Sequence, residues 1–264
     1  MDNKEYFEIN KKNWNERVQA HMDSDFYDMK AFEAGATSLK EIELDILGDI
    51  SGKRVLHLQC HFGQDALSLA RMGADVTGID LSDKAIEKAR EIASKLNVEA
   101  EFVCCNVLEI DQHLTGEYDI IFTTYGVVGW LPELTKWAKL IHQFLKPQGR
   151  FLLVEFHPVV WMHDDDFKQI AYSYFNKEAI IETSEGSYAD KDTSHNYESV
   201  GWNHDLSEVF TALLQAGLQI KLFKEYDFSP YNCFNNTVPA EKGFQIKGLE
   251  GKLPMVYAVE ATKL

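Results

Sequence analysis

The chain has 264 residues, enough for one large domain or for a domain whose site is covered by a cap. Its content of 45% apolar and 26% charged residues is ordinary for a globular protein, and no apolar run is long enough to span a membrane. A net charge of −16 argues against a surface that binds phosphate backbones, so we expect neither nucleic acid nor a membrane as a partner.

The cysteines and the N-terminus bear on the compartment. None of the four cysteines has the C-x-x-C spacing of a zinc site, and the first residues are charged and carry no apolar signal sequence. We therefore expect a reduced, cytoplasmic protein.

Helical and strand patterns alternate along the first 156 residues. Two helices are predicted at 3–20 and 37–47, because apolar residues recur there at helical spacing. The elements expected after them are a strand at 53–58, an amphipathic segment from 66, a strand at 75–80, a helix at 82–96, strands at 100–105 and 118–123, a helix at 132–145, a turn at 146–149 and a strand at 150–156. This alternation indicates a doubly wound α/β sheet with mostly parallel strands.

The pattern breaks between residues 157 and 203, which are polar, aromatic and poorly periodic. An insertion of this length after a strand is usually functional or disordered. Helical spacing returns at 206–214 and ends at Gly217, and strands at 218–228 and 254–262 complete a seven-stranded sheet. We expect an N-terminal helical cap (1–50), a cofactor-binding core (51–156), a substrate lid insertion (157–203) and a C-terminal part of the core sheet (204–264).

Residues 54–80 form the most informative stretch. A strand runs into the turn Gln-Cys-His-Phe-Gly, which ends at Gly63, and a second strand ends at Asp80. An acid at that strand tip of a β-α-β unit usually binds a nucleoside ribose. Dinucleotide sites have glycines where this chain has Gln59 and His61, whose side chains would crowd a diphosphate. The pattern favours an adenosine cofactor without phosphates, of which S-adenosylmethionine is the common one.

From residue 53 to about residue 150 the chain resembles a class I S-adenosylmethionine-dependent methyltransferase. The first motif of that family has an acid followed by the pattern G-x-G-x-G; here Gly63 alone remains of the glycines, and His57 replaces the acid. The string Leu-His-Leu-Gln-Cys-His-Phe-Gly-Gln-Asp is similar to that of a bacterial branch of the family. The resemblance implies a Rossmann-like fold with an antiparallel C-terminal hairpin, and S-adenosylmethionine as the cofactor. The family's acid helps to hold the methionine end of the cofactor.

The resemblance also assigns roles to residues. Asp80 would accept hydrogen bonds from the ribose hydroxyls or, alternatively, only cap the next helix, while Leu81 and Ile86 would flank the adenine. Asn106 would meet the adenine amino group through its carbonyl oxygen, or merely cap a turn. The residues expected to touch the cofactor are Trp14, Arg17, Gln59, Cys60, His61, Gly63, Asp80, Leu81, Ser82, Asn106, Val107 and Tyr125.

In similar methyltransferases an N-terminal helix closes over the cofactor. Trp14 and Arg17 share one face of the first predicted helix, so Arg17 could meet the cofactor carboxylate, with surface packing as the alternative. Tyr125, Trp130 and His157 are expected to line the substrate pocket, because they follow strands at the edge where ligands bind.

Methyl transfer to a small organic acceptor is the leading functional hypothesis. The sulfonium is already activated, so the protein mainly has to align the acceptor for in-line displacement and exclude water. His157 is the candidate general base. Irregular histidine spacing argues against a metal site, and no base pairs with Cys60 to make it a nucleophile. The alternatives are a nicotinamide-dependent oxidoreductase, whose glycine-rich turn and Tyr-x-x-x-Lys relay are missing, and a non-catalytic S-adenosylmethionine-binding protein.

Overall fold

The computed structural model describes residues 2–175, 178–190 and 195–264. Its α-helices are α1 (Asn3–Asp23), α2 (Met29–Glu33), α3 (Glu41–Leu47), α4 (Gln64–Arg71), α5 (Asp83–Leu96), α6 (Thr135–Phe144) and α7 (Leu206–Gln215), and its 3-10 helices are η1 (Val107–Gln112), η2 (Val128–Trp130) and η3 (Val160–Met162). Its strands are β1 (Arg54–His57), β2 (Asp75–Asp80), β3 (Glu101–Cys104), β4 (Tyr118–Thr124), β5 (Leu145–Phe156), β6 (Ile180–Glu185), β7 (Asn196–Gly201), β8 (Leu218–Tyr226), β9 (Thr237–Ala240), β10 (Gly243–Ile246) and β11 (Val256–Lys263).

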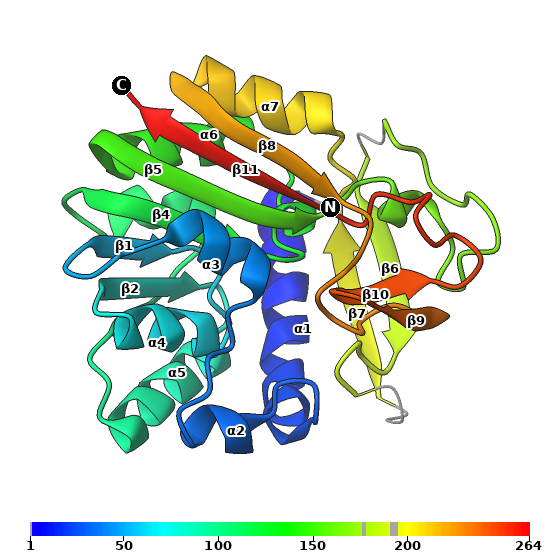
Figure 1. Ribbon diagram of the computed structural model, residues 1–264, viewed down its shortest axis with the longest axis horizontal. Helices are drawn as coiled ribbons and strands as arrows, with labels where there is room; N and C mark the ends of the chain where they lie inside the picture. The colour runs from blue at the N-terminus through cyan, green and yellow to red at the C-terminus, as the bar shows by residue number, and fades with distance from the viewer. Residues whose placement is uncertain (1, 176–177, 191–194) are drawn as a thin grey trace.

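A seven-stranded sheet organises the fold (Figure 1). Its strands follow the order β3-β2-β1-β4-β5-β11-β8; β1 to β5 are parallel, and β11 is antiparallel to both of its neighbours. The winding direction reverses between β1 and β4, and ligands of open α/β sheets bind at such a point, outside the carboxyl ends of the strands. The predicted doubly wound, mostly parallel sheet with an antiparallel C-terminal hairpin is confirmed.

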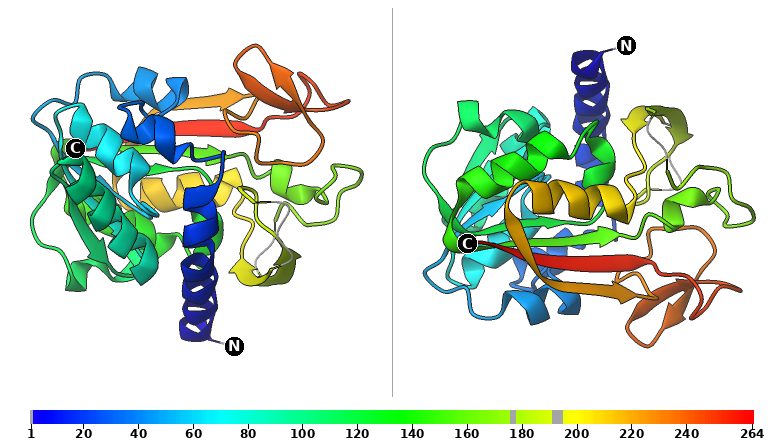
Figure 2. Two further views of the ribbon diagram at one scale, coloured as in Figure 1. Left: turned by 90° about the horizontal axis from the view of Figure 1, so that it is seen from below. Right: turned by 90° about the horizontal axis from the view of Figure 1, so that it is seen from above.

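Each face of the sheet packs against its own layer of helices, because successive side chains of a strand point to opposite faces. Val55 and Phe122 belong to a core with residues of α3, α4 and α5. Leu56 and Ile121 belong to a second core with residues of η1, α6 and α7. The two views of Figure 2 show α3 and α4 on one side of the sheet and α6 and α7 on the other. A rigid three-layer scaffold therefore presents the strand ends.

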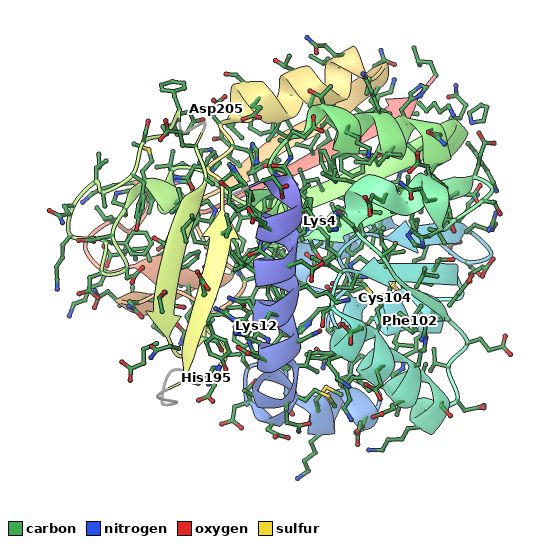
Figure 3. The ribbon with its side chains drawn as sticks, turned by 180° about the vertical axis from the view of Figure 1, so that it is seen from behind. Lys4, Lys12, Phe102, Cys104, His195 and Asp205 are labelled. Atoms are coloured by element: carbon green, nitrogen blue, oxygen red, sulfur yellow. The ribbon has the colours of Figure 1, made fainter. Side chains whose placement is uncertain are left out.

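Two hairpins and α1 cover the carboxyl ends of the strands. The hairpins β6–β7 and β9–β10 are both antiparallel and lie beyond the ends of β5, β8 and β11 (Figure 1). Seen from behind, α1 runs between β7 and the α5 side of the core (Figure 3). The amide of Asn10 in α1 donates to the carbonyl of Val200 at 2.8 Å and accepts from its N–H at 2.9 Å. The hairpin β6–β7 is thus hydrogen-bonded to α1.

The structure differs from the predicted elements in two places. β5 begins at Leu145, and the expected turn at 146–149 is an irregularity of this strand, with Gln148 at a φ of 62° and a register shift against β4. The hairpin β9–β10 occupies what looked like a plain connection between the last two strands. Strands of four residues, one of them containing Pro239, are too short to show a clear alternation.

Within residues 2–175, 178–190 and 195–264, none of the helices combines the length and the apolar composition of a bilayer span.

Candidate functional site

A cavity of about 950 Å³ opens at the carboxyl ends of β1, β2, β4 and β5, under α1 and the hairpins. Of the residues expected to touch the cofactor, all line this cavity except Ser82. Of those expected to line the substrate pocket, Tyr125 and Trp130 do so and His157 does not.

The turn after β1 takes its shape from three residues with left-handed backbone. Gln59, His61 and Gly63 have φ values of 54°, 50° and 81°, which only Gly63 adopts without strain. A Cβ on Gly63 would lie 2.7 Å from Cε1 of Phe102, so packing as well as backbone geometry requires glycine there. Burial raises the pKa of the Cys60 thiol well above its ordinary value, so this residue is not an activated nucleophile.

Asp80 connects the turn after β1 to the end of β2. One carboxylate oxygen accepts from the N–H of His61 and the other from the N–H of Ser82, both at 2.8 Å. Each oxygen has a second lone pair, and the side chain lines the cavity, so both can still accept ribose hydroxyls. Burial raises the pKa of Asp80 to about 6 despite these hydrogen bonds.

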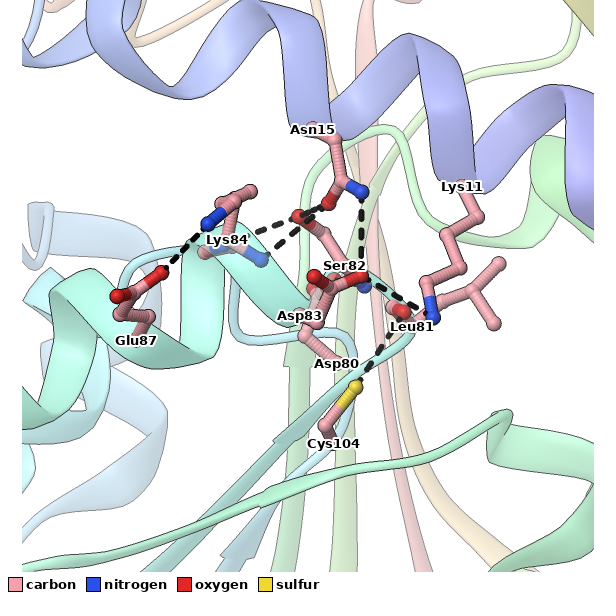
Figure 4. Close-up of polar contacts among 10 residues, drawn as sticks. Lys11, Asn15, Asp80, Leu81, Ser82, Asp83, Lys84, Glu87 and Cys104 are labelled. Atoms are coloured by element: carbon pink, nitrogen blue, oxygen red, sulfur yellow. Dashed lines mark hydrogen bonds and ion pairs between the residues drawn. The ribbon is translucent and has the colours of Figure 1, made fainter.

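Ser82 is a structural residue, contrary to its predicted contact with the cofactor (Figure 4). Its hydroxyl accepts from the N–H of Ala85 at 3.0 Å as the N-cap of α5 and donates to Asn15 of α1 at 2.6 Å. The side chain is fully buried outside the cavity. Asn15 also donates to Asp83, which forms an ion pair with Lys11. These contacts fix α1 beside the adenosine half of the predicted site.

The adenine side of the predicted site is formed by the ends of β2 and β3. Leu81, Asn106 and Val107 line the cavity, whereas Ile86 is buried in the core below it. The carbonyl oxygen of Asn106 accepts from the N–H of Leu108 at 3.0 Å and so caps η1. The capping role foreseen as the alternative for Asn106 is therefore present, in a residue that also lines the cavity.

Arg17 is a buried cation that lines the cavity. Its guanidinium lies 5.7 Å from the ring centre of Trp14 and 4.7 Å from that of Tyr197, and 7% of the residue is exposed. Its Nε has no hydrogen-bond partner, and no carboxylate of the described chain forms an ion pair with it. Burial lowers the pKa of Arg17, but a guanidinium remains charged at neutral pH. A buried, unpaired cation is costly and indicates an anionic group of a ligand.

Tyr125 stands at the tip of β4 with a φ of 39°, a strained conformation for a bulky residue. Its hydroxyl donates to Oε2 of Glu43 at 2.8 Å, and Oε1 of Glu43 accepts from the N–H of Lys40. Glu43 is fully buried in α3, and burial raises its pKa to about 7, with the charge of Asp65 adding to the shift. Tyr125 thus connects the cavity wall to a buried carboxyl group of the N-terminal segment.

Glu155 holds the loop after β4 in place. Its carboxylate accepts from the N–H groups of Gly126, Val127 and Val128, and from that of Phe156. These hydrogen bonds oppose the effect of burial, which raises the pKa of Glu155. With four donors on it, this carboxylate positions the loop.

His157 turns away from the cavity, contrary to its predicted place in the substrate pocket. Its Nε2 lies 3.0 Å from Oε1 of Glu225 on β8, and its Nδ1 accepts from the N–H of Val159 at 3.2 Å. The strand ladder continues past β5 through a bond from the N–H of His157 to Met255, so the side-chain direction alternates and His157 faces opposite to Phe156. His157 is therefore not placed to act as a general base on a ligand in the cavity. Within the described ranges, no three His, Cys, Asp or Glu side chains gather as they would around a metal ion.

Aromatic rings form the part of the cavity farthest from Asp80 along the sheet edge. Tyr125, Phe156, Trp161 and Phe234 contact one another, with ring centres 5.0 to 5.8 Å apart. We call these four residues the aromatic compartment. Its residues come from the end of β4, the end of β5, η3 and the segment between β8 and β9, and they line the same cavity as the turn after β1.

Several site residues escaped the sequence analysis. Tyr27, Asp65 and Lys40 line the cavity, and Nδ1 of His21 shares a hydrogen bond of 3.1 Å with Nε2 of the lining residue His61. Burial lowers the pKa of His21 to about 3, so this ring is neutral. Asp65 is the last residue of the string Leu-His-Leu-Gln-Cys-His-Phe-Gly-Gln-Asp, so its place in this motif was a signal for a role in the site. The others lie in the N-terminal segment, where nothing in the sequence shows which residues fold over the sheet.

Comparison with known proteins identifies the family. Residues 49–211, more than half of the chain, match the family model described as a methyltransferase domain. The chain therefore belongs to this family of methyltransferase domains.

Curated relatives match over part of their length. An uncharacterized methyltransferase of Synechocystis is 32% identical over 130 residues, which are 48% of this chain and 59% of the relative. A ubiquinone biosynthesis O-methyltransferase of Bordetella avium is 31% identical over 105 residues, 40% of this chain and 43% of the relative. The chain thus spans about half the length of the curated relatives that it matches.

Solved structures share the fold. An S-adenosylmethionine-dependent methyltransferase of Mesorhizobium loti superposes with a TM-score of 0.56 at 16% identity, covering 88% of this chain and all of that one (100%). Magnesium protoporphyrin IX methyltransferase of Synechocystis, solved with bound S-adenosylhomocysteine, has a TM-score of 0.52 at 14% identity. The superposition covers 95% of this chain and 100% of that one.

The cavity fits S-adenosylmethionine. It offers a carboxylate with free lone pairs at the end of β2, an amide at the end of β3 and a buried, unpaired guanidinium on α1. These are the group types that ribose hydroxyls, adenine and the methionine carboxylate would need. A turn that requires Gly63 lies between them.

Proposed function

We propose that this methyltransferase acts on a small, partly apolar organic acceptor, and that it promotes in-line displacement mainly by positioning. The observation that carries the proposal is the aromatic compartment, which shares one cavity with the predicted cofactor residues. Aromatic walls with a few polar groups are typical of small-molecule sites. The Bordetella relative is an O-methyltransferase, so a hydroxyl acceptor is the first class to test.

The cofactor residues hold their ligand from three sides in this proposal. Asp80 accepts the ribose hydroxyls, Asn106 and Leu81 face the adenine, and Arg17 binds the methionine carboxylate. When bound, S-adenosylmethionine supplies a methyl group already activated on a sulfonium. Trp14 and Trp130, whose ring centres lie 5.2 Å apart, close the wall between α1 and the loop after β4 and keep water out.

We base the positioning account on three histidines. His157 lies outside the cavity, and burial lowers the pKa of both His57 and His61, which makes these two rings weak bases. A phenol or thiol acceptor can ionise with little help, and alignment of such a nucleophile can contribute several kcal/mol, up to roughly 7–11.

Calorimetry tests the cofactor half of the proposal. We expect S-adenosylhomocysteine to bind in the micromolar range, about −8 kcal/mol, and NAD to bind far more weakly. Tighter binding of NAD would overturn it.

A matched acceptor series tests the other half. Labelled S-adenosylmethionine is offered with phenol, thiophenol, aniline and benzoate carriers that share one aromatic body, and with a short RNA and a protein mixture. We expect label on the phenol or thiol carriers. Transfer confined to RNA or protein would contradict a small-molecule acceptor.

A further inference from the structure

Asp65 lines the cavity and has no assigned role so far. It follows Gly63 by two residues in the first turn of α4 and lines the cavity. Its Oδ2 accepts from the hydroxyl of Thr124, at the end of β4, at 3.2 Å. The side chain therefore reaches the switch point between β1 and β4, where ligands of this fold class bind.

The carboxylate of Asp65 has no cationic partner. None of the described Lys, Arg or His side chains forms an ion pair with it, and the Thr124 hydroxyl is its one side-chain hydrogen bond in this part of the chain. It is close enough to His57, Tyr125 and Glu43 for its charge to act on all three: it adds to the rise that burial causes in the pKa of Glu43 and Tyr125, and it partly opposes the lowering that burial causes in the pKa of His57. A partly buried carboxylate in such surroundings favours a cation.

His57 occupies the position of the family's acid at the end of β1, but it cannot provide a negative charge for a ligand cation. It is 3% exposed, its Nδ1 has no partner among the described residues, and burial lowers its pKa to about 4. The ring is neutral at physiological pH. The charged group that acts on His57 is Asp65 of α4, which accepts a hydrogen bond from Thr124.

Arg17 provides the opposite charge. It lines the same cavity, is buried, and has no anionic partner. No ion pair joins Arg17 to Asp65, so the cavity contains an unpaired cation and an unpaired anion that do not neutralise each other. A ligand with an α-ammonium and an α-carboxylate on one carbon would pair with both.

We propose that Asp65, oriented by Thr124, binds the α-ammonium of the methionine part of S-adenosylmethionine, while Arg17 binds its α-carboxylate. The assignment rests on the proposed function, in which Arg17 takes the carboxylate. In the family's first motif, the acid that helps to hold the methionine end stands at the end of β1, where this chain has His57. In our proposal the corresponding acid is Asp65, at the start of α4.

Other charged groups in the cavity are less suited to this task. Both oxygens of Asp80 accept backbone N–H groups at the end of β2, away from Thr124. Asp165 is exposed on the segment after η3. The ammonium of Lys40 lies 4.8 Å from the ring centre of Tyr231, but Lys40 is only partly buried, whereas Arg17 is buried and its Nε has no hydrogen-bond partner.

Four ligands that differ at the amino acid end test the assignment by calorimetry. They are S-adenosylhomocysteine, its decarboxylated analogue, its deaminated analogue and 5′-methylthioadenosine, which lacks both charged groups. For Asp65→Asn we expect at least tenfold weaker binding of the two ligands that carry the ammonium, and less than twofold change for the other two. For Arg17→Gln we expect the loss on the two ligands that carry the carboxylate.

Matched variants keep the test sharp. Asp165→Asn, another carboxylate of the cavity lining, should leave all four affinities within twofold. Thr124→Val keeps the charge and should weaken ammonium-bearing ligands selectively, which tests the assignment even if Asp65→Asn does not fold. An equal change for all four ligands, or none, in the Asp65 or Thr124 variant would overturn the role of Asp65. Failure of the wild type to bind any of the four would overturn the proposed function instead.

Discussion

Asp80 stabilises the turn after β1 and, in our proposal, also accepts hydrogen bonds from the ribose hydroxyls. Asp80→Ala would remove the acceptor of the His61 and Ser82 N–H groups as well as the ligand contact. We expect cofactor binding to weaken by about 1.5–3 kcal/mol and the free energy of unfolding to fall by about 1–2 kcal/mol. Calorimetry and urea denaturation measure the two effects. Glu99→Ala, at an exposed site outside the cavity, is the control, and an unchanged dissociation constant in folded Asp80→Ala would reduce Asp80 to a cap.

Glu43 gives stability a definite pH dependence. Burial raises its pKa from 4.5 to about 7, so between these values the folded protein binds a proton that the unfolded chain has released. Deprotonation of Glu43 therefore lowers the free energy of unfolding as the pH rises from about 4.5 to 7, by up to about 3 kcal/mol.

Urea denaturation of wild type and Glu43→Gln across pH 4.5–8 measures this effect. The Gln side chain cannot ionise, so the free energy of unfolding of Glu43→Gln should rise relative to that of the wild type as the pH rises. The titration of Asp80 occurs in both proteins and cancels from the difference. Parallel curves would show that Glu43 does not titrate in this range.

Helix α1 and strand β7 are joined by a reciprocal pair of hydrogen bonds. Asn10 is 2% exposed and satisfies both backbone groups of Val200. Asn10→Ala should lower the free energy of unfolding by about 1–3 kcal/mol, because both groups of Val200 lose their partner in a buried place. Hydrogen exchange at residues 196–201 should accelerate. Glu8→Ala, on the exposed face of the same helix, should change neither quantity, and slow exchange in both variants would refute the link.

At the scale of the whole molecule, the sheet is a preformed base and the covering elements are its less stable part. The central strands are buried on both faces, whereas β6 is largely exposed. We therefore expect hydrogen exchange in residues 157–203 and α1 to be faster than in β1 and β4, and to slow when cofactor and acceptor are both bound. Protection of 157–203 equal to that of the central strands in the empty protein would indicate a rigid structural insert.

The local sequence already determined the core of this protein. Strand and helix periodicities located the βαβ units, and Gly63 and Asp80 located the site, because a turn that requires glycine and an acid at a strand tip are features of adjacent residues. The parallel order then brings the strand ends to one edge. The methyltransferase hypothesis rested on these few positions.

Other features were decided only by the tertiary structure, because they depend on groups far apart in the chain. The hydroxyl of Ser82 is taken up by Asn15, 67 residues away. The ladder beyond β5 turns His157 toward Glu225. Asp65 meets Thr124, 59 residues further along the chain, only in the folded protein, and Arg17 lines the cavity because α1 lies between α5 and β7. Periodicity tells which face of an element is buried, but a side chain's partner is fixed by three-dimensional packing, and that packing placed the charges of this site.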